Sequence, residues 1–211
     1  MRPFGYYTLY AAESLRKFRY RSGHGVHSPL AFDLISNVAS SPIPFYAFGE
    51  IANKLPDDTP KRDLRVGQFL FRLLAHAPEE EVIYLTDNLS ARMPEWGKAS
   101  TPNSSHIILS EGEKVRSSAT PFLVYAATPS LAQDYLKGHK DPLCKCDAMP
   151  HRPMLLIDGI RRSKKEYQVW RECLQSCLFR CIVLDFYHCV LVVGGHRAQT
   201  QLFRGYLSLT F

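Results

Sequence analysis

The chain has 211 residues and a formal net charge of +6, with 45% hydrophobic and 22% charged residues. This length suits one domain with a full hydrophobic core, and these fractions exclude wholesale disorder and fibrous repeats. Asp185 and His188 interrupt the longest apolar run, so it falls short of the roughly 18 residues that a membrane-spanning helix needs. The aromatic N-terminus meets Glu13 early, which is atypical of a secretory signal. We therefore expect a soluble cytoplasmic protein with no membrane partner.

The first 30 residues are basic and aromatic. They hold five Lys and Arg residues against a single acidic residue, Glu13. Two hypotheses explain this pattern: a nucleic-acid surface, or an amphipathic helix that docks its aromatic side chains on the domain. The second is favoured, because clustered charges usually face solvent. The basic residues are Arg2, Arg16, Lys17, Arg19 and Arg21, and a second basic cluster holds Arg161, Arg162, Lys164 and Lys165.

Helical patterns fill the first third of the chain. Ser28 and Pro29 predict an N-cap followed by proline at the first helical position, and prolines in 41–44 end that helix. A short helix is expected over 46–54, and a stronger one covers 66–74 and stops before Pro78. These patterns predict a helical N-terminal arm, residues 1–60, packed on a main domain, residues 61–211.

Short apolar runs then replace the helical pattern. Continuous runs of this kind are typical of strands buried on both faces of a parallel sheet. Ser163 and Glu166 form a capping box that opens a helix after the fourth run. The alternation predicts an α/β fold with a Rossmann-like, mostly parallel sheet flanked by helices. The predicted strands are 82–85, 106–109, 122–125 and 154–157, a helix covers 129–138, and 182–186 with 189–193 predict either one bent strand or a hairpin.

The six cysteines need not form a disulfide scaffold in a chain of this length. Cys173, Cys177 and Cys181 recur every fourth residue, and would stack on one helix face if the helix reaches that far. Burial as small hydrophobic side chains is favoured over metal binding. Cys144 and Cys146 form a CxC pair without a second pair at zinc-finger spacing, so we predict no metal site.

Polar residues follow several predicted strands. In open α/β sheets ligands bind beyond the carboxyl ends of the strands, so these residues are candidates for a site. Each of them alone could simply cap the next helix, whereas four on one rim would indicate binding. The candidates are Asp87, Glu111, Thr128 and Asp158.

Several motifs resemble a known family. Residues 21–29, RSGHGVHSP, followed by FDLI at 32–35, resemble the "RHGIHSPFVFDLI" opening of class I S-adenosylmethionine-dependent methyltransferase-like proteins common in Bacteroidetes. Residues 46–51, 67–73 and 158–163 with Trp170 are similar to further segments of that family. The resemblance covers most of the chain and implies a divergent, shortened methyltransferase-like protein with S-adenosylmethionine as its cofactor.

The resemblance also assigns roles to individual residues. Residues 107–112, IILSEG, resemble the family's "VITIEG" strand, which implies that Glu111 receives the ribose hydroxyls of the cofactor. Thr86, Asp87 and Thr128, which follow predicted strands, are the other candidate cofactor contacts. Asp158, His24 and His27 are the implied catalytic residues, of which Asp158 or a histidine would accept the proton of the methyl acceptor.

The chain also departs from the family. The family's glycine-rich "ELGTSLG" turn corresponds here to YLTDNLS at 84–90, which contains no glycine, so side chains should obstruct the cofactor. A third strand has no room between Glu111 and Phe122. Asp158 stands alone where the family has an acidic pair, too few oxygen ligands for Mg²⁺. We therefore expect a degenerate cofactor motif, with loss of catalysis favoured over retention. The alternative is a non-catalytic module that binds nucleic acid or protein through the basic arm.

Overall fold

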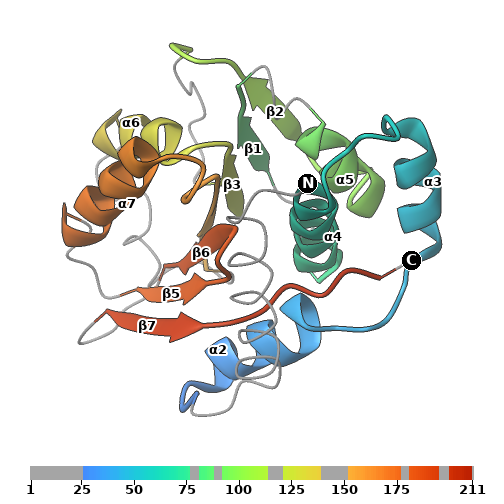
Figure 1. Cartoon of the computed structure of the whole chain (residues 1–211), viewed down its shortest axis with the longest axis horizontal. Helices are drawn as coiled ribbons and strands as arrows, with labels where there is room; N and C mark the ends of the chain where they lie inside the picture. Colours follow the sequence, from blue (N-terminus) through green and yellow to red (C-terminus); the bar gives the residue numbers. More distant parts are fainter. Residues whose placement is uncertain are drawn as a thin grey trace, which may run out of the picture.

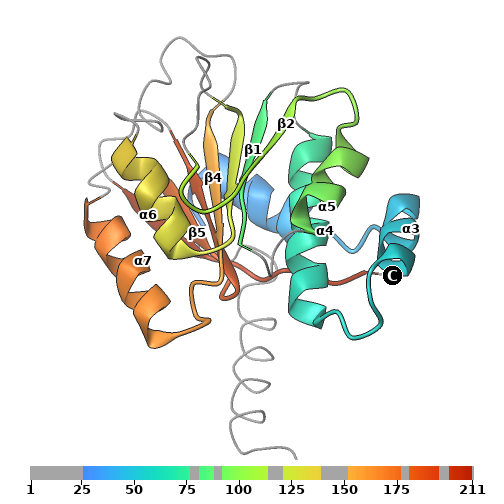
Figure 2. The same ribbon diagram turned by 90° about the horizontal axis from the view of Figure 1, so that it is seen from above.

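The computed structural model describes residues 26–76, 81–87, 92–113, 121–138, 152–176, 181–194 and 200–210. A central sheet lies between two layers of helices, as Figures 1 and 2 show. The predicted α/β fold with a mostly parallel, Rossmann-like sheet is thereby confirmed. His24 and the basic residues before it lie outside the described residues. No helix within the described ranges is long and apolar enough to cross a bilayer.

The sheet has seven strands in the order β2-β1-β3-β4-β6-β5-β7. β6 runs antiparallel to both its neighbours, and every other pair of adjacent strands is parallel. The runs at 182–186 and 189–193 therefore form a hairpin rather than one bent strand. The strands are Val82–Leu85 (β1), His106–Leu109 (β2), Leu123–Ala126 (β3), Met154–Asp158 (β4), Ile182–Asp185 (β5), Cys189–Val193 (β6) and Gln201–Arg204 (β7).

Helices cover both faces of the sheet, and alternate strand residues pack against them. Val82 and Tyr84 of β1 join the core on one face, whereas Ile83 and Leu85 join the core on the other. β1, β3 and β6 are buried at every position, which is why they are continuous apolar runs in the sequence. The first face carries Pro29–Asp33 (α2), Leu34–Ala39 (η1), Tyr46–Lys54 (α3), Lys61–Ala75 (α4) and Met93–Ser100 (α5), and the second carries Pro129–Gly138 (α6) and Lys164–Ser176 (α7) (Figure 2).

The first described helix begins as predicted and then changes type. The side chain of Ser28 accepts a hydrogen bond from the amide of Ala31 at 3.4 Å, so the predicted N-cap is confirmed. From Leu34 the helix widens into the π-helix η1, in which the amide of Ser40 donates to the carbonyl of Ile35 at 2.9 Å. The predicted helix over 46–54 is confirmed as α3.

The predicted capping box is half formed. The amide of Glu166 donates to Ser163 Oγ at 3.1 Å, as a capping box requires. The Glu166 carboxylate, however, turns away from Ser163 and accepts from the amide and the hydroxyl of Ser130 at 3.2 and 2.9 Å. This carboxylate therefore joins the start of α7 to the start of α6.

The cysteines follow the packing expectation but do not share one helix. α7 ends at Ser176, so Cys181 lies just before β5 and not on that helix. Cys173 and Cys181 are both buried among apolar side chains, as favoured over metal binding. Cys144, Cys146 and Cys177 lie outside the described residues.

A polar strip on α4 holds the segment that follows β7. Gln68 accepts a hydrogen bond from the amide of Thr210 at 2.9 Å, and the guanidinium of Arg72 donates to Thr210 Oγ1 at 2.6 Å. The Arg72 guanidinium also lies over the ring of Phe48, 5.2 Å from its centroid. Burial lowers the pKa of Arg72 to about 10. Residues 208–210 are thus part of the packed helical face.

Glycine permits the close approach of α4 and α5. A Cβ atom on Gly67 would overlap the indole ring of Trp96. We expect Gly67→Ala to lower the free energy of unfolding by about 1–3 kcal/mol, because overpacking forces neighbouring side chains to move. Gly49, on the exposed side of α3, has no atom near its Cβ position. Gly49→Ala is the matched control and should raise stability by roughly 0.5–1 kcal/mol. Urea unfolding measures both, and equal effects of the two substitutions would contradict the packing argument.

Candidate functional site

The strand order creates a switch point between β1 and β3. The chain passes from β1 outward to β2 and then returns to the other side of β1 as β3. In open α/β sheets the crevice at such a reversal, beyond the carboxyl ends of the strands, is where ligands bind. Thr86 and Asp87 follow β1 at this place, and Ala127 and Thr128 follow β3.

Asp158, at the carboxyl end of β4, is the most deeply buried acid of this edge, with 2% of its surface exposed. Its Oδ1 accepts from Arg62 Nη2 and from the amide of Gly159, both at 2.6 Å. Its Oδ2 accepts from the hydroxyl of Tyr125 at 3.3 Å. Burial disfavours the charge on Arg62, but the attraction and hydrogen bond of Asp158 outweigh it, so the pKa of Arg62 is raised. Both carboxylate oxygens are therefore engaged within the chain.

A second ion pair crosses the switch point. Arg162, after β4, donates to Asp87 Oδ2 at 2.8 Å, and Asp87 follows β1. Because β3 lies between β1 and β4, the pair spans the carboxyl end of β3. Gly159 packs closely against this ion pair and has a φ of 67°. A Cβ atom at Gly159 would lie 3.1 Å from the carbonyl oxygen of Ala127 and 3.4 Å from Arg162 Nε. The Arg162 side chain therefore lies where the crevice would open.

A third pair closes the hairpin between β5 and β6. Arg161 donates two hydrogen bonds to the Asp185 carboxylate, at 2.9 and 3.2 Å, and a third to the carbonyl of Tyr187 at 2.7 Å. Its guanidinium lies 4.7 Å from the ring centroid of Tyr187. Tyr187 has φ of 74°, and the amide of His188 donates to the carbonyl of Phe186 at 3.0 Å, which indicates a strained γ-turn. The Arg161 contacts hold this strained turn in place.

We refer to these three ion pairs, Arg62–Asp158, Arg162–Asp87 and Arg161–Asp185, as the arginine clasp. Asp63 lies beside it on the first turn of α4, where burial, opposed by Arg62, raises its pKa. Ionisable groups with shifted pKa values often mark functional sites, and structural ion-pair networks shift pKa values too. Among the described residues, no group of three or more His, Cys, Asp or Glu side chains is placed to hold a metal ion.

The structure brings two of the predicted site residues into the clasp. Asp87 and Asp158 belong to it, at the ends of β1 and β4. Thr86 is buried and its hydroxyl donates to the carbonyl of Leu109 at 3.5 Å, which links β1 to β2. Thr128 accepts from the amide of Leu131 at 3.3 Å and thereby caps α6. The two threonines thus have local structural roles.

The other predicted residues lie apart from the clasp. Glu111 is exposed in the turn after β2, next to Gly112 with its φ of 87°. His27 is exposed just before the N-cap of α2, and no hydrogen bond or ion pair between described residues joins it to the clasp. His24 is outside the described residues. The sequence did not reveal the clasp residues Arg62 and Asp185 as part of a site, nor Tyr125, which donates to Asp158.

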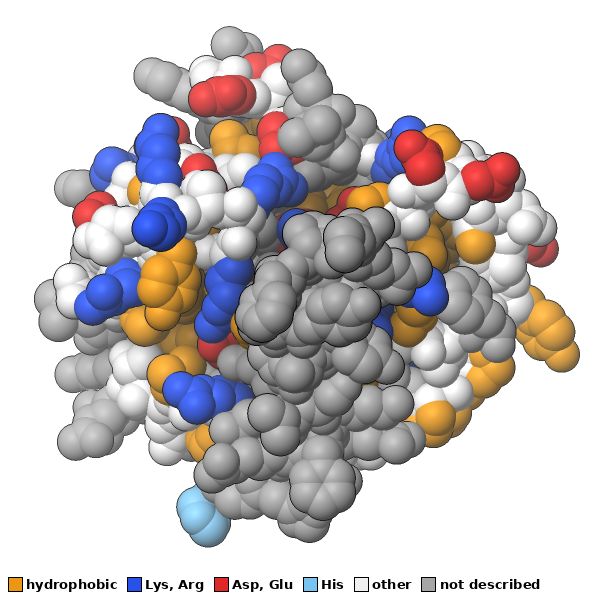
Figure 3. All heavy atoms as spheres, viewed as in Figure 1, with side chains coloured by type: hydrophobic (Ala, Val, Ile, Leu, Met, Phe, Trp, Pro, Cys, Tyr) orange, Lys and Arg blue, Asp and Glu red, His pale blue; other side chains and the backbone are white. Residues whose placement is uncertain are grey.

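The second basic cluster is partly neutralised. Arg161 and Arg162 both form ion pairs with aspartates, whereas Lys164 and Lys165 are exposed on the first turn of α7. In Figure 3 the Lys and Arg side chains on the side of α6 and α7 are separated by hydrophobic and neutral surface. A phosphate group bound here would have to compete with the two aspartates.

Comparisons of the chain with protein-family models, with curated proteins and with solved structures find no match. The methyltransferase resemblance therefore stays a hypothesis. The contacts of the arginine clasp are relevant to this hypothesis, because they lie where a doubly wound sheet binds its ligand.

The buried and exposed pairs of the clasp should differ in energy. Arg62→Gln leaves the buried Asp158 carboxylate without its cation, so we expect the free energy of unfolding to fall by about 3 kcal/mol. Arg162→Gln removes a more exposed pair and should cost under about 1 kcal/mol. Urea unfolding of the two variants at neutral pH measures the difference. Equal, small losses would show that Asp158 does not depend on Arg62.

Proposed function

We propose that this chain is a divergent methyltransferase-like protein that no longer transfers methyl groups and acts as a non-catalytic binding module. The observation that carries the proposal is the Arg162–Asp87 ion pair, which crosses the carboxyl end of β3 at the switch point of the sheet. A nucleoside cofactor of a doubly wound sheet binds at such a point. Here the chain's own side chains lie across it.

The residues present do not fit S-adenosylmethionine. Its sulfonium group is a cation, and the guanidinium of Arg162 at the switch point would repel it. Asp87, the acid that follows β1 at this point, is already paired with Arg162. Glu111 remains as an exposed carboxylate after β2, and a ribose contact by itself is a weak basis for cofactor binding.

The clasp also engages Asp158, one of the bases that the resemblance implies. General acid–base catalysis needs a side chain within hydrogen-bond reach of the substrate. Asp158 is 2% exposed, and its two oxygens already accept from Arg62, Gly159 and Tyr125. This arrangement supports a structural role for Asp158, in which it anchors the start of α4 to the sheet.

Isothermal titration with S-adenosylmethionine and S-adenosylhomocysteine tests the proposal. We expect no saturable binding at micromolar concentrations of either compound to the full chain. Micromolar binding that is lost in Glu111→Ala and kept in the control Glu50→Ala, an exposed carboxylate on α3, would overturn the proposal in favour of an active cofactor site. Methyl-transfer activity with S-adenosylmethionine would overturn it as well.

A further inference from the structure

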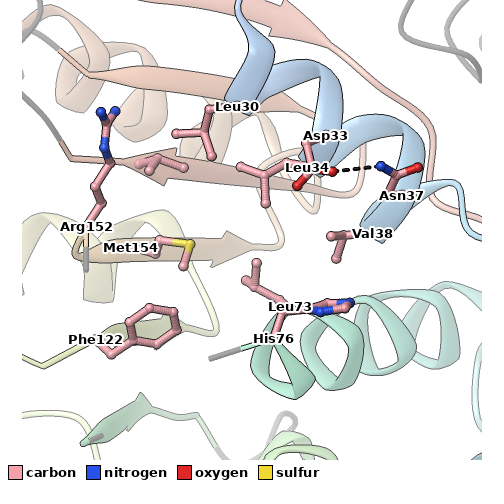
Figure 4. A pocket seen from close by; sticks show the side chains of 11 residues that line it. Leu30, Asp33, Leu34, Asn37, Val38, Leu73, His76, Phe122, Arg152 and Met154 are labelled. Atoms are coloured by element: carbon pink, nitrogen blue, oxygen red, sulfur yellow. Dashed lines mark hydrogen bonds between the residues drawn. The ribbon is translucent and has the colours of Figure 1, made fainter. Parts of the chain in front are cut away.

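A cavity of about 610 Å³ lies at the amino-terminal edge of the sheet, at the other end of β4 from the clasp. Phe122 just before β3, Met154 at the start of β4 and Val193 at the end of the antiparallel β6 form its sheet side. Leu73 and His76, at the end of α4, lie opposite (Figure 4). This volume is within the range of about 300–1,000 Å³ that small-molecule sites occupy.

The interior of the cavity is apolar. Figure 4 shows Leu34 of η1 and Leu73 of α4 pointing toward each other across it, with Phe122 and Met154 on the sheet side. Leu34, Leu73 and Phe122 are buried, although they face this space. An apolar, partly enclosed cavity favours a ligand with a hydrocarbon body, because burial removes apolar surface from water on both partners.

The polar residues lie on the rim of the cavity and differ in their partners. Asp33 Oδ1 accepts a hydrogen bond from Asn37 Nδ2 at 2.7 Å, drawn as a dashed line in Figure 4. Arg152 is exposed on the opposite side and makes no hydrogen bond or ion pair with any described residue. The rim therefore offers a carboxylate that already has a donor and a guanidinium that has no acceptor among the described residues.

The helical wall of the cavity is an unusual element. The π-helix η1 supplies Leu34, Asn37 and Val38. π-helical turns are rare and are frequently found at functional sites. This observation is independent of the cavity's size and of the charge on its rim.

The geometry points to a binding site for an amphipathic carboxylate, an aliphatic monocarboxylic acid whose chain enters the cavity and whose carboxylate pairs with Arg152. A guanidinium matches a carboxylate in shape and charge and binds it with two parallel hydrogen bonds. This site is separate from the switch point. Failure of this proposal would therefore leave the proposed loss of methyl transfer unaffected, and the reverse also holds.

The test compares three ligands with the same chain length and different head groups. Decanoate, decan-1-ol and decylamine are each titrated, below their aggregation concentrations, into the full chain by isothermal titration. We expect decanoate to bind at least about tenfold more tightly than decan-1-ol, because a charge-assisted hydrogen bond is worth more than a neutral one. Decylamine should bind most weakly, since the guanidinium of Arg152 repels its ammonium group.

Two variants and one control locate the site. Arg152→Gln should remove the preference for decanoate over decan-1-ol, and Arg171→Gln, an exposed arginine on α7, should keep it. Leu30→Trp places a bulky indole ring in the partly buried wall of the cavity and should weaken the binding of all three ligands alike. Absence of decanoate binding, tighter binding of decylamine, or a preference that survives in Arg152→Gln would overturn the proposal. Because Arg152 is exposed, Arg152→Gln should fold. This variant therefore tests the proposal even if Leu30→Trp fails to fold.

Discussion

One buried ion pair determines the arrangement of the carboxyl edge of the sheet. Asp158 ends β4 almost out of contact with water, and a carboxylate in that position requires a cation and hydrogen-bond donors. Arg62, Gly159 and Tyr125 supply them. Since Arg62 lies in the first turn of α4, the pair fixes the start of that helix against the sheet. α4 in turn contacts α5 and η1, so the packing of the helical face depends on this anchor.

The two edges of the sheet have opposite chemistry. At the carboxyl edge the clasp pairs three arginines with three aspartates, and it crosses the place where doubly wound sheets bind ligands. The amino edge has an apolar cavity with a separate cation on its rim. Fold alone does not decide function, and in this chain the described residues line a cavity at the edge that the fold class would not suggest.

The sequence predicts those parts of this structure that contacts between neighbouring residues determine. Strands β1, β3 and β6 are continuous apolar runs because both of their faces are buried, and Ser28 caps its helix through a contact three residues away. Arg62 and Asp158 are 96 residues apart, so no local pattern pairs them. Their proximity follows from the topology instead. α4 precedes β1 and runs in the opposite direction to it, which places the first turn of α4 at the carboxyl edge. α5 lacks a signal because it has only eight residues, one of them a glycine, and β7 is short and largely exposed.

The segment after β7 has a consequence for the order in which the chain folds. The amide and hydroxyl of Ser208 donate hydrogen bonds to the carbonyls of Ala39 and Ser41, residues about 170 positions earlier, and Gly205 lies against Ile35. Contacts between such distant parts of a chain close late, because the loop between them must be ordered first. During synthesis η1 therefore leaves the ribosome long before the residues that pack behind it. The π-helical wall of the cavity therefore gains this support only after the segment that follows β7 has docked.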